Sequence, residues 1–196
     1  MPTTIGFFLF DGVEELDWAG PWEVLASWAT RWPDDGVHCF TMSQTGAAVW
    51  CARGARVLVD HSWDDAPVAD VLVYPGGIGT RPQVDDEAVL AWVRTAAANA
   101  QVVASVCTGA LVLGSAGLLD DRPATTHWRA VDELRGLGRR IEVRAGERFV
   151  DDGNIVTSAG ISAGIDMALH LVARLHSVER AREVRHQMQY DPKPPV

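Results

Sequence analysis

The chain has 196 residues, of which 47% are hydrophobic and 22% are charged, a composition typical of an ordinary globular protein with a substantial core. Its net charge of -9 argues against a nucleic-acid partner, because no basic stripe is present to release counterions from phosphates. The long uncharged stretch at residues 95–119 is interrupted by glycines and hydroxyl side chains, so we expect no membrane partner.

Short apolar runs rich in valine, isoleucine and phenylalanine predict β-strands, because each run is too short for a helix. They lie at residues 5–10, 37–42, 71–74, 102–106 and 155–157. An Asp-Gly turn between two apolar pairs predicts a β-hairpin at residues 149–156.

Helical patterns alternate with these strands. Pro21 is expected in the first turn of a helix, where its missing N–H group costs nothing. The expected buried face of this helix consists of Trp22, Leu25, Ala26 and Ala29. A second helix starts at the acidic residues 85–87, a third follows Cys107, and the last helices run over residues 162–190. The second is expected to bury Val89, Trp92, Val93 and Ala96, and the last ones Ile165, Leu169, Val172 and Leu175.

This alternation predicts an α/β fold with a mostly parallel central sheet that helices cover on both faces. We expect one domain over residues 1–190 and a loose tail with three prolines at 191–196. Because such folds bind ligands at the carboxyl ends of their strands, the loops that follow the strands are the candidate site.

Cys107, in the loop after the fourth predicted strand, is a candidate nucleophile. A strand that turns sharply into a helix exposes the side chain of the turn, which is the geometry of a nucleophile elbow. The helix start adds unpaired N–H groups and partial positive charge, and we expect both to favour the thiolate. The alternative is an inert core residue, which is the more common role of a lone cysteine.

The cysteine content also bears on metals and on location. Cys39, Cys51 and Cys107 are an odd number, without the spacing of a zinc site or a disulfide framework. The N-terminus has no basic segment before its short apolar run, so we expect no signal peptide. These features predict a cytoplasmic protein without a metal site.

Other residues are candidates to assist Cys107. Asp17 follows the first strand at the same sheet edge, and a carboxyl group beside a buried thiolate suits acid–base work; the alternative is a carboxylate bound to a helix start. His127 is either a partner of the cysteine or a hydrogen-bonded group packed beneath the site. Gly76 and Gly77, in the turn at residues 74–79, either direct N–H groups into a site or form an ordinary turn.

Six segments together resemble the DJ-1/PfpI superfamily, a flavodoxin-like branch of the class I glutamine-amidotransferase-like folds, and within it the isonitrile hydratases. The segments are residues 16–21, 74–79, 105–109, 124–128, 152–154 and 160–166. They span almost the whole chain. Cys-Thr-Gly after an apolar strand, combined with Leu-Asp and Ala-Thr-Thr-His-Trp, is specific for a subgroup rather than for one enzyme.

The resemblance implies a flavodoxin-like three-layer sandwich, a homodimer, and no metal or organic cofactor. It implies a nucleophile at Cys107, assisted by Asp17 and Thr108, that adds water to a small isocyanide and releases an N-substituted formamide through a thioimidate. We expect N–H groups near Gly77 and Thr108 to stabilise developing charge. The expected substrate and oxyanion site consists of Gly76, Gly77, Trp18 and Ile161, with His127 in support.

The chain departs from parts of the superfamily. Protease-like and amidase-like members have a histidine where this chain has Thr108, which argues against a Cys-His hydrolase. Glyoxalase and deglycase members use a glutamate where Asp17 stands, and the bulky Trp18 and Trp22 are expected to reshape the pocket. The alternatives are a glyoxalase or deglycase, a ligand-sensing domain related to the N-terminal half of AraC-type regulators, and an oxidation sensor. No basic helix-turn-helix follows residue 190, which favours the enzyme.

Overall fold

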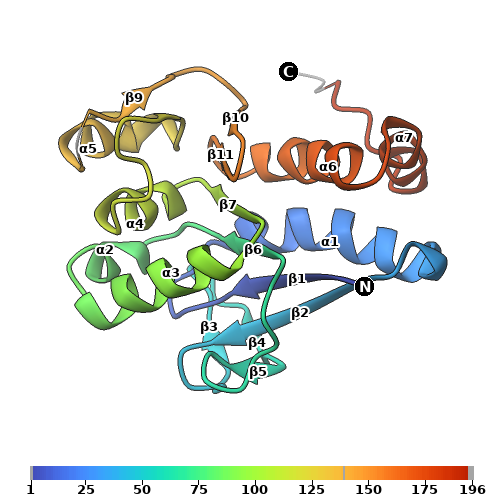
Figure 1. Cartoon of the computed structure of the whole chain (residues 1–196), viewed down its shortest axis with the longest axis horizontal. Coiled ribbons are helices and arrows are strands. Elements are labelled where there is room, and N and C mark those ends of the chain that lie inside the picture. Colours follow the sequence, from blue (N-terminus) through green and yellow to red (C-terminus); the bar gives the residue numbers. More distant parts are fainter. Residues whose placement is uncertain (1, 139, 194–196) are drawn as a thin grey trace.

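A seven-stranded sheet forms the centre of the molecule (Figure 1), which a computed structural model describes over residues 2–138 and 140–193. The strands are β1 (Thr3–Phe8), β2 (Val37–Ser43), β3 (Val49–Trp50), β4 (Arg56–Val57), β5 (His61–Ser62), β6 (Val71–Tyr74), β7 (Val102–Val106), β8 (Pro123–Ala124), β9 (Glu142–Val143), β10 (Phe149–Asp152) and β11 (Ile155–Ser158). The helices are α1 (Glu15–Arg31), α2 (Thr80–Gln83), α3 (Glu87–Asn99), α4 (Gly109–Ser115), α5 (Val131–Gly136), α6 (Ala163–Leu175) and α7 (Val178–Gln187), with 3-10 helices η1 (Pro33–Asp35) and η2 (Trp128–Ala130).

The order of the strands in this sheet is β10-β11-β7-β6-β1-β2-β5. Every neighbouring pair is parallel except β10 and β11, which form the predicted antiparallel hairpin. The mostly parallel sheet is therefore confirmed. In the register of the central strands, Tyr74 at the end of β6 pairs with Ser105 of β7, so the loops after both strands meet at one edge.

Helices cover both faces of the sheet, which gives the expected three layers. Alternate residues of β6 enter opposite cores, because successive side chains of a strand point to opposite faces. Val71 and Val73 pack with residues of α1, α6 and α7, whereas Leu72 and Tyr74 pack with residues of α3, α4 and α5. The flavodoxin-like architecture that the sequence predicted is confirmed.

Helix α1 differs from the prediction in both its start and its buried face. It begins at Glu15, so Pro21 lies inside the helix rather than in its first turn. Pro21 has no N–H group to donate to the Asp17 carbonyl, which lies four residues earlier. The expected face of Trp22, Leu25, Ala26 and Ala29 was partly correct: Leu25 is buried, and Trp22 is half-buried against the same core. The buried residues of the helix are Asp17, Gly20, Pro21, Val24, Leu25 and Trp28.

Small residues explain why that face packs inward. Helices α1 and α6 lie side by side over the sheet (Figure 1). A Cβ atom on Gly20 would lie 3.0 Å from the Ile165 side chain, and one on Gly164 would lie 3.3 Å from the Pro21 ring. The expected inner face of α6 was partly correct: Val172 is fully buried, and Ile165, Leu169 and Leu175 are half-buried against the same core. The other fully buried side chains of α6 are Ala163, Met167, Ala168 and Leu171.

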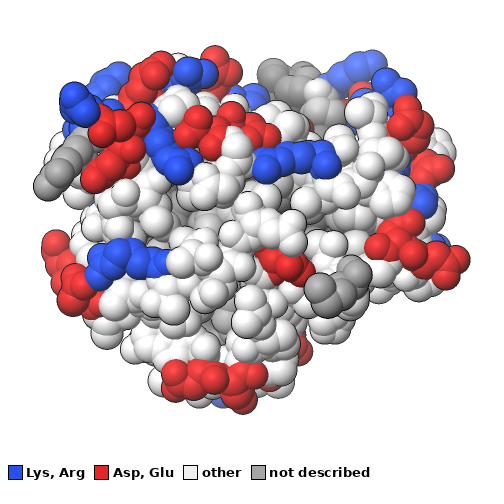
Figure 2. Space-filling model, in the orientation of Figure 1, with Lys and Arg blue, Asp and Glu red and all other residues white. Residues whose placement is uncertain are grey.

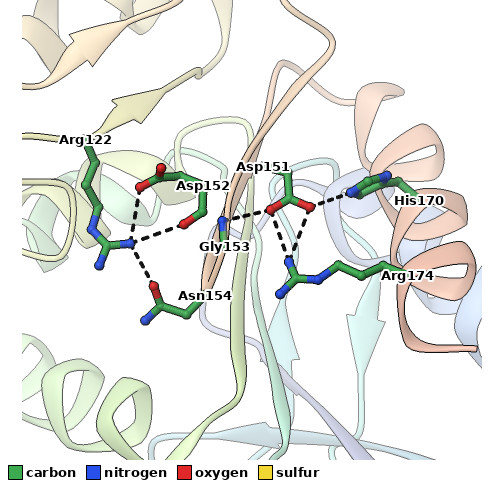
Figure 3. A network of polar contacts seen from close by, with 7 residues as sticks. All are labelled: Arg122, Asp151, Asp152, Gly153, Asn154, His170 and Arg174. Carbon is green, nitrogen blue, oxygen red and sulfur yellow. Dashed lines mark hydrogen bonds and ion pairs between the residues drawn. The ribbon is translucent and has the colours of Figure 1, made fainter.

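Ion pairs hold the hairpin β10–β11 against its neighbours (Figure 3). The Asp151 carboxylate accepts hydrogen bonds from His170 Nε2 at 2.6 Å and from Arg174 Nη1 at 3.1 Å, both on α6. On the other side, Arg122 Nη1 donates to Asn154 Oδ1 at 2.8 Å and lies 3.3 Å from Asp152 Oδ2. These contacts fix the strand that leads into the loop at residues 159–162.

Charged side chains lie mostly towards the edges of the face in Figure 2, with both signs mixed over α5, β9 and α7. Of the predicted tail, residues 191–193 carry no helix or strand, although Arg185 Nη2 contacts the Asp191 carboxylate at 3.2 Å. Residues 194–196 lie outside the described residues. Among residues 2–138 and 140–193, no helix combines the length and the apolar character needed to cross a bilayer.

Candidate active site

Cys107 occupies a strained turn between β7 and α4. Its φ is +57°, in the left-handed region that non-glycine residues rarely adopt. Its N–H group donates to the carbonyls of Ser158 and Ala159, at 3.1 Å each, and its carbonyl accepts from Thr126 Oγ1 at 2.7 Å. Gly109 permits this turn, because a Cβ atom there would lie 2.3 Å from the Tyr74 carbonyl oxygen. The nucleophile elbow is therefore fixed on both sides.

Asp17 lies beside this sulfur, on the first turn of α1. The side chain is fully buried, its Oδ2 accepts a hydrogen bond from the Gly76 N–H group at 3.0 Å, and the Cys107 thiol donates to the carboxylate. Burial raises the pKa of Asp17 to about 7, against the opposing effect of these two hydrogen bonds. Oδ1 has no hydrogen-bond partner among the described residues. The proximity expected from the sheet topology is confirmed.

The protonation of Cys107 differs from the expectation of a thiolate. Burial raises the pKa of the thiol to about 12, and the negative charge of Asp17 adds to the rise. Backbone N–H groups of Thr108 and Ile161 point at the sulfur and oppose it. These N–H groups thus lower the pKa of the thiol, as expected for the helix start. The desolvation of the sulfur, which the prediction omitted, outweighs them. Between about pH 7 and about pH 12 the carboxyl and the thiol together hold one proton.

Gly76 and Gly77 have a different role from the expected donation to a developing charge. The Gly76 N–H group is bound to Asp17, and the Gly77 N–H group donates to Thr108 Oγ1 at 2.9 Å. Thr108 Oγ1 also accepts from Thr80 Oγ1 at 3.1 Å. These groups orient the carboxyl and the threonine rather than remaining free. The N–H groups of Thr108 and Ile161, beside the sulfur, are the donors left facing the reacting position.

A pocket of about 490 Å³ opens onto the sulfur. Cys107 is 6% exposed, whereas Ile78 and Trp128 are 68% and 71% exposed, so the cysteine lies deep and the two apolar side chains lie at the mouth. The residues that line the pocket are Glu14, Ala52, Arg53, Gly77, Ile78, Arg81, Cys107, Thr108, His127, Trp128, Arg129 and Ile161. The sequence predicted Cys107, Thr108, Gly77, Ile161 and His127 among these.

Trp18 does not belong to this lining, contrary to the expectation. It follows Asp17 on α1 and so points away from the sulfur. Its indole N–H group is buried without a hydrogen-bond partner among the described residues. Burial raises the pKa of the Cys51 thiol, and Trp18 opposes the rise. All three cysteines are free.

His127 lines the pocket and packs on Gly160, where a Cβ atom would lie 2.3 Å from its Cδ2. Its Nδ1 accepts a hydrogen bond from the Arg129 N–H group at 3.2 Å, so the neutral ring carries its proton on Nε2. Burial lowers the pKa of His127, and the charges of Arg129 and Arg81 lower it further. No hydrogen bond joins it to Cys107 among the described residues, so it is a neutral wall of the pocket.

Sequence reasoning missed several charged residues of the pocket. Glu14, Arg53, Arg81 and Arg129 all line it, and in the sequence they are indistinguishable from solvated surface residues. Thr126, which holds the Cys107 carbonyl, was also missed, although it precedes the candidate His127 in the sequence. Within the described part of the chain, no three histidine, cysteine or carboxylate side chains are grouped so that they could hold a metal ion.

The geometry of the elbow, with a carboxyl group beside it, can be compared with known proteins. A sequence model of the DJ-1/PfpI family matches residues 3–174. The chain belongs to the DJ-1/PfpI family. The family match includes the elbow and the first turn of α1, so Cys107 and Asp17 both lie inside it.

Relatives of different kinds share this DJ-1/PfpI fold. Isonitrile hydratase of Pseudomonas putida is 45% identical over all of this chain and 82% of its own length. The transcriptional regulator GbdR of Pseudomonas aeruginosa is 30% identical over 97% of this chain, which spans about half (51%) of the regulator. Among solved structures, a THiJ/PfpI family protein from Pseudomonas syringae is 31% identical over the whole chain and 78% of its own, with a TM-score of 0.90.

Proposed function

We propose that the protein hydrates isocyanides to N-substituted formamides, with Cys107 as the nucleophile and Asp17 as the acid and base. The observation that carries the proposal is a buried carboxyl group beside an elbow thiol at the base of an open pocket, a pair that can share and move a proton. The 45% identity to an isonitrile hydratase over the whole chain supports this choice of reaction. Asp17 is the group suited to move that proton, because its pKa of about 7 matches the working pH of a general acid and base.

In the first step, the sulfur of Cys107 attacks the terminal carbon of R–N≡C. The thiol proton passes to Asp17 as the C–S bond forms, and Asp17 then delivers it to the same carbon. The product is a thioimidate, R–N=CH–S–Cys, which contains all atoms of the substrate and the thiol. Covalent capture divides one difficult addition into two easier ones.

In the second step, water adds to the thioimidate carbon. Asp17, again a carboxylate, accepts a proton from the water and passes it to the nitrogen, which gives R–NH–CH(OH)–S–Cys. The C–S bond then breaks, the hydroxyl proton is lost as the carbonyl forms, and the sulfur regains its proton through Asp17. The N–H groups of Thr108 and Ile161 stabilise the departing sulfur, since charge-assisted hydrogen bonds favour the thiolate.

The test is turnover of cyclohexyl and aryl isocyanides by the purified protein, with chromatographic detection of the formamide. We expect wild type to form formamide, Cys107→Ser to form none above background, and Cys39→Ser, which removes a half-buried thiol outside the pocket, to match wild type. Mass spectrometry of the acid-quenched wild-type reaction is expected to detect the substrate mass added to Cys107. Absence of formamide from wild type overturns the hydratase proposal. Conversion of methylglyoxal that depends on Cys107 would replace it with a glyoxalase.

One observation favours a second candidate, a ligand-sensing domain. Similarity to transcriptional regulators of Pseudomonas aeruginosa covers 92–97% of this chain, although the chain spans only about half of each (51–53%). A sensor binds its ligand without consuming it. Isocyanides that shift the melting temperature but give neither formamide nor a covalent adduct would therefore favour the sensor.

A further inference from the structure

Three arginines and one glutamate line the mouth of the pocket in a protein whose net charge is -9. Two of these arginines have carboxylate partners. Arg53 Nε lies 3.2 Å from Glu14, and Arg81 Nη2 lies 3.1 Å from Glu133, while Arg81 Nη1 donates to Thr80 Oγ1. Their charges are therefore largely matched within the protein.

Arg129 is the exception. Its guanidinium lies over the exposed Trp128 ring, 4.7 Å from the ring centre, and no carboxylate of the described residues pairs with it. Stacking fixes the plane of the guanidinium and leaves its edge N–H groups free, which is the geometry that binds a planar carboxylate in bidentate fashion. An aromatic face and an unmatched cation thus lie together at the entrance to the Cys107 pocket.

The charges around the mouth of the pocket favour a ligand that carries a negative charge. Burial lowers the pKa of His127, and the charges of Arg129 and Arg81 act in the same direction and outweigh the opposing effect of Glu14. The buried carboxyl of Asp17 is bound at the far end, by the Gly76 N–H group and the thiol. A ligand with a negative charge at the mouth and its reacting carbon at the sulfur therefore keeps its charge away from Asp17.

We propose, on the basis of the isocyanide hydration proposed above, that the preferred substrates are isocyanides with an apolar body and a distal carboxylate. Arg129 binds the carboxylate, and the exposed side chains of Trp128 and Ile78 contact the apolar body. The pocket of about 490 Å³ has room for such a molecule, which is larger than the reacting group alone. Arg129 is then a specificity-determining residue for the reaction.

The test compares 4-isocyanobenzoate with its neutral methyl ester, which carries a similar electron-withdrawing group. We expect wild type at low salt to favour the carboxylate by about tenfold in kcat/KM, the size of a partly screened charge-assisted contact. Arg129→Gln is expected to reduce this preference to about twofold or less, because it removes the charge that would bind the carboxylate. The preference of wild type is also expected to fall as salt rises from about 0.02 M to about 0.5 M.

Arg56→Gln is the matched control. Arg56 also stacks on an exposed tryptophan, Trp50, at 5.4 Å, but neither residue lines the pocket. Loss of this arginine changes the net charge equally and is expected to leave the tenfold preference intact. If wild type uses both compounds equally, or if the preference survives Arg129→Gln, the proposed preference for carboxylate-bearing isocyanides is wrong. The hydratase proposal would still stand. If wild type converts neither compound nor any other isocyanide, the proposed function itself fails.

Discussion

At the scale of single residues, the proposed chemistry depends on the coupling of Asp17 and Cys107. Burial raises the pKa of both groups, and the carboxylate raises the pKa of the thiol further, whereas the thiol lowers the pKa of the carboxyl group. The pair rather than either side chain therefore sets the pH dependence. The reactive form carries one proton, whether the sulfur or the carboxyl holds it at a given moment.

This coupling predicts a rise in kcat/KM with pH, with a midpoint near 7, where the pair loses its first proton. Below that pH, Asp17 is protonated and cannot accept the thiol proton. Asp17→Asn removes the base, so we expect the rate to fall by about 100-fold or more and the midpoint to move upward by at least about one unit, towards ionisation of the thiol alone. Formamide formation measured from pH 5 to about 10 tests this. A wild-type profile that is flat through pH 7, or a variant that keeps the same midpoint, would contradict the assignment of Asp17.

A second residue-scale prediction concerns Gly76. A Cβ atom there would lie 2.5 Å from the Thr108 nitrogen and 2.8 Å from Asp17 Oδ2, so Gly76→Ala must separate the groups that orient the carboxyl. We expect a loss of about 1–3 kcal/mol in the free energy of unfolding and a fall in kcat/KM of about 100-fold. Gly136→Ala is the control, because a Cβ atom at that helical position meets nothing within 4 Å. Thermal melts and formamide assays of both variants make the comparison; equal behaviour of the two would refute the tight packing at Gly76.

At the scale of elements, the longer strands could be predicted, the two-residue strands β3, β4, β5, β8 and β9 could not, and the faces of two helices could be predicted only in part. Parallel strands buried on both sides appear as continuous apolar runs, so β6 and β7 agree with the prediction. In α1 the apolar and small residues surround much of the helix, and the buried face follows from contact with α6 at Gly20 and Pro21. That contact joins residues far apart in the chain, and sequence periodicity carries no information about it.

The hairpin β10–β11 leads to a prediction at this scale. Burial tends to raise the pKa of Asp151, but hydrogen bonds from His170 and Gly153 and the charge of Arg174 outweigh it, so the pKa is lowered. Because the pKa of Asp151 is lower in the folded than in the unfolded protein, its carboxylate stabilises the fold at pH values above the unfolded-state pKa, near 3.9. This stabilisation is lost as the pH falls through the folded-state pKa. Asp151→Asn is therefore expected to lower stability by about 1–2 kcal/mol at pH 7.

For a chain of this size, this corresponds to a fall of roughly 2–8 °C in the melting temperature. Asp132→Asn serves as the control, because Asp132 also pairs with an arginine but its side chain is 94% exposed. Exposed pairs contribute little, so the control is expected to melt within about 2 °C of wild type. Scanning calorimetry at pH 7 distinguishes the two, and an unchanged melting temperature for Asp151→Asn would show that the network in Figure 3 does not secure the hairpin.

At the scale of the whole molecule, the sequence predicted the fold and the proximity of Asp17 and Cys107 because the sheet topology brings the loops after β1 and β7 to one edge. It could not predict the mouth of the pocket. Arg81 and Arg129 lie in segments where exposed arginines are ordinary, and only the folded chain shows that they converge. The protonation of Cys107 was missed for a related reason, since desolvation depends on neighbours from α1, α4 and the loop at residues 159–162.

The buried Asp17 carboxylate is expected to lower the stability of the whole fold. Burial raises the pKa of Asp17 from 3.8 in the unfolded chain to about 7 in the folded protein. The contribution of Asp17 to the free energy of unfolding is therefore fully present at pH values below 3.8 and is lost as the pH rises through about 7. Asp17→Asn is therefore expected to stabilise the protein at pH 8, by roughly 1–3 kcal/mol, and to do so less at pH 5.

Asp35→Asn provides an opposite case with the same change in net charge. Burial acts to raise the pKa of Asp35, but hydrogen bonds from Arg180 Nε at 2.7 Å and Trp28 Nε1 at 2.6 Å outweigh it, so the pKa is lowered. This carboxylate links η1 to α7, and its removal is expected to destabilise the protein at both pH 8 and pH 5. If net charge alone set stability, both variants would shift the melting temperature in the same direction. Opposite shifts at pH 8 would show that the environment of each carboxylate decides, with Asp17 retained for chemistry and Asp35 for the fold.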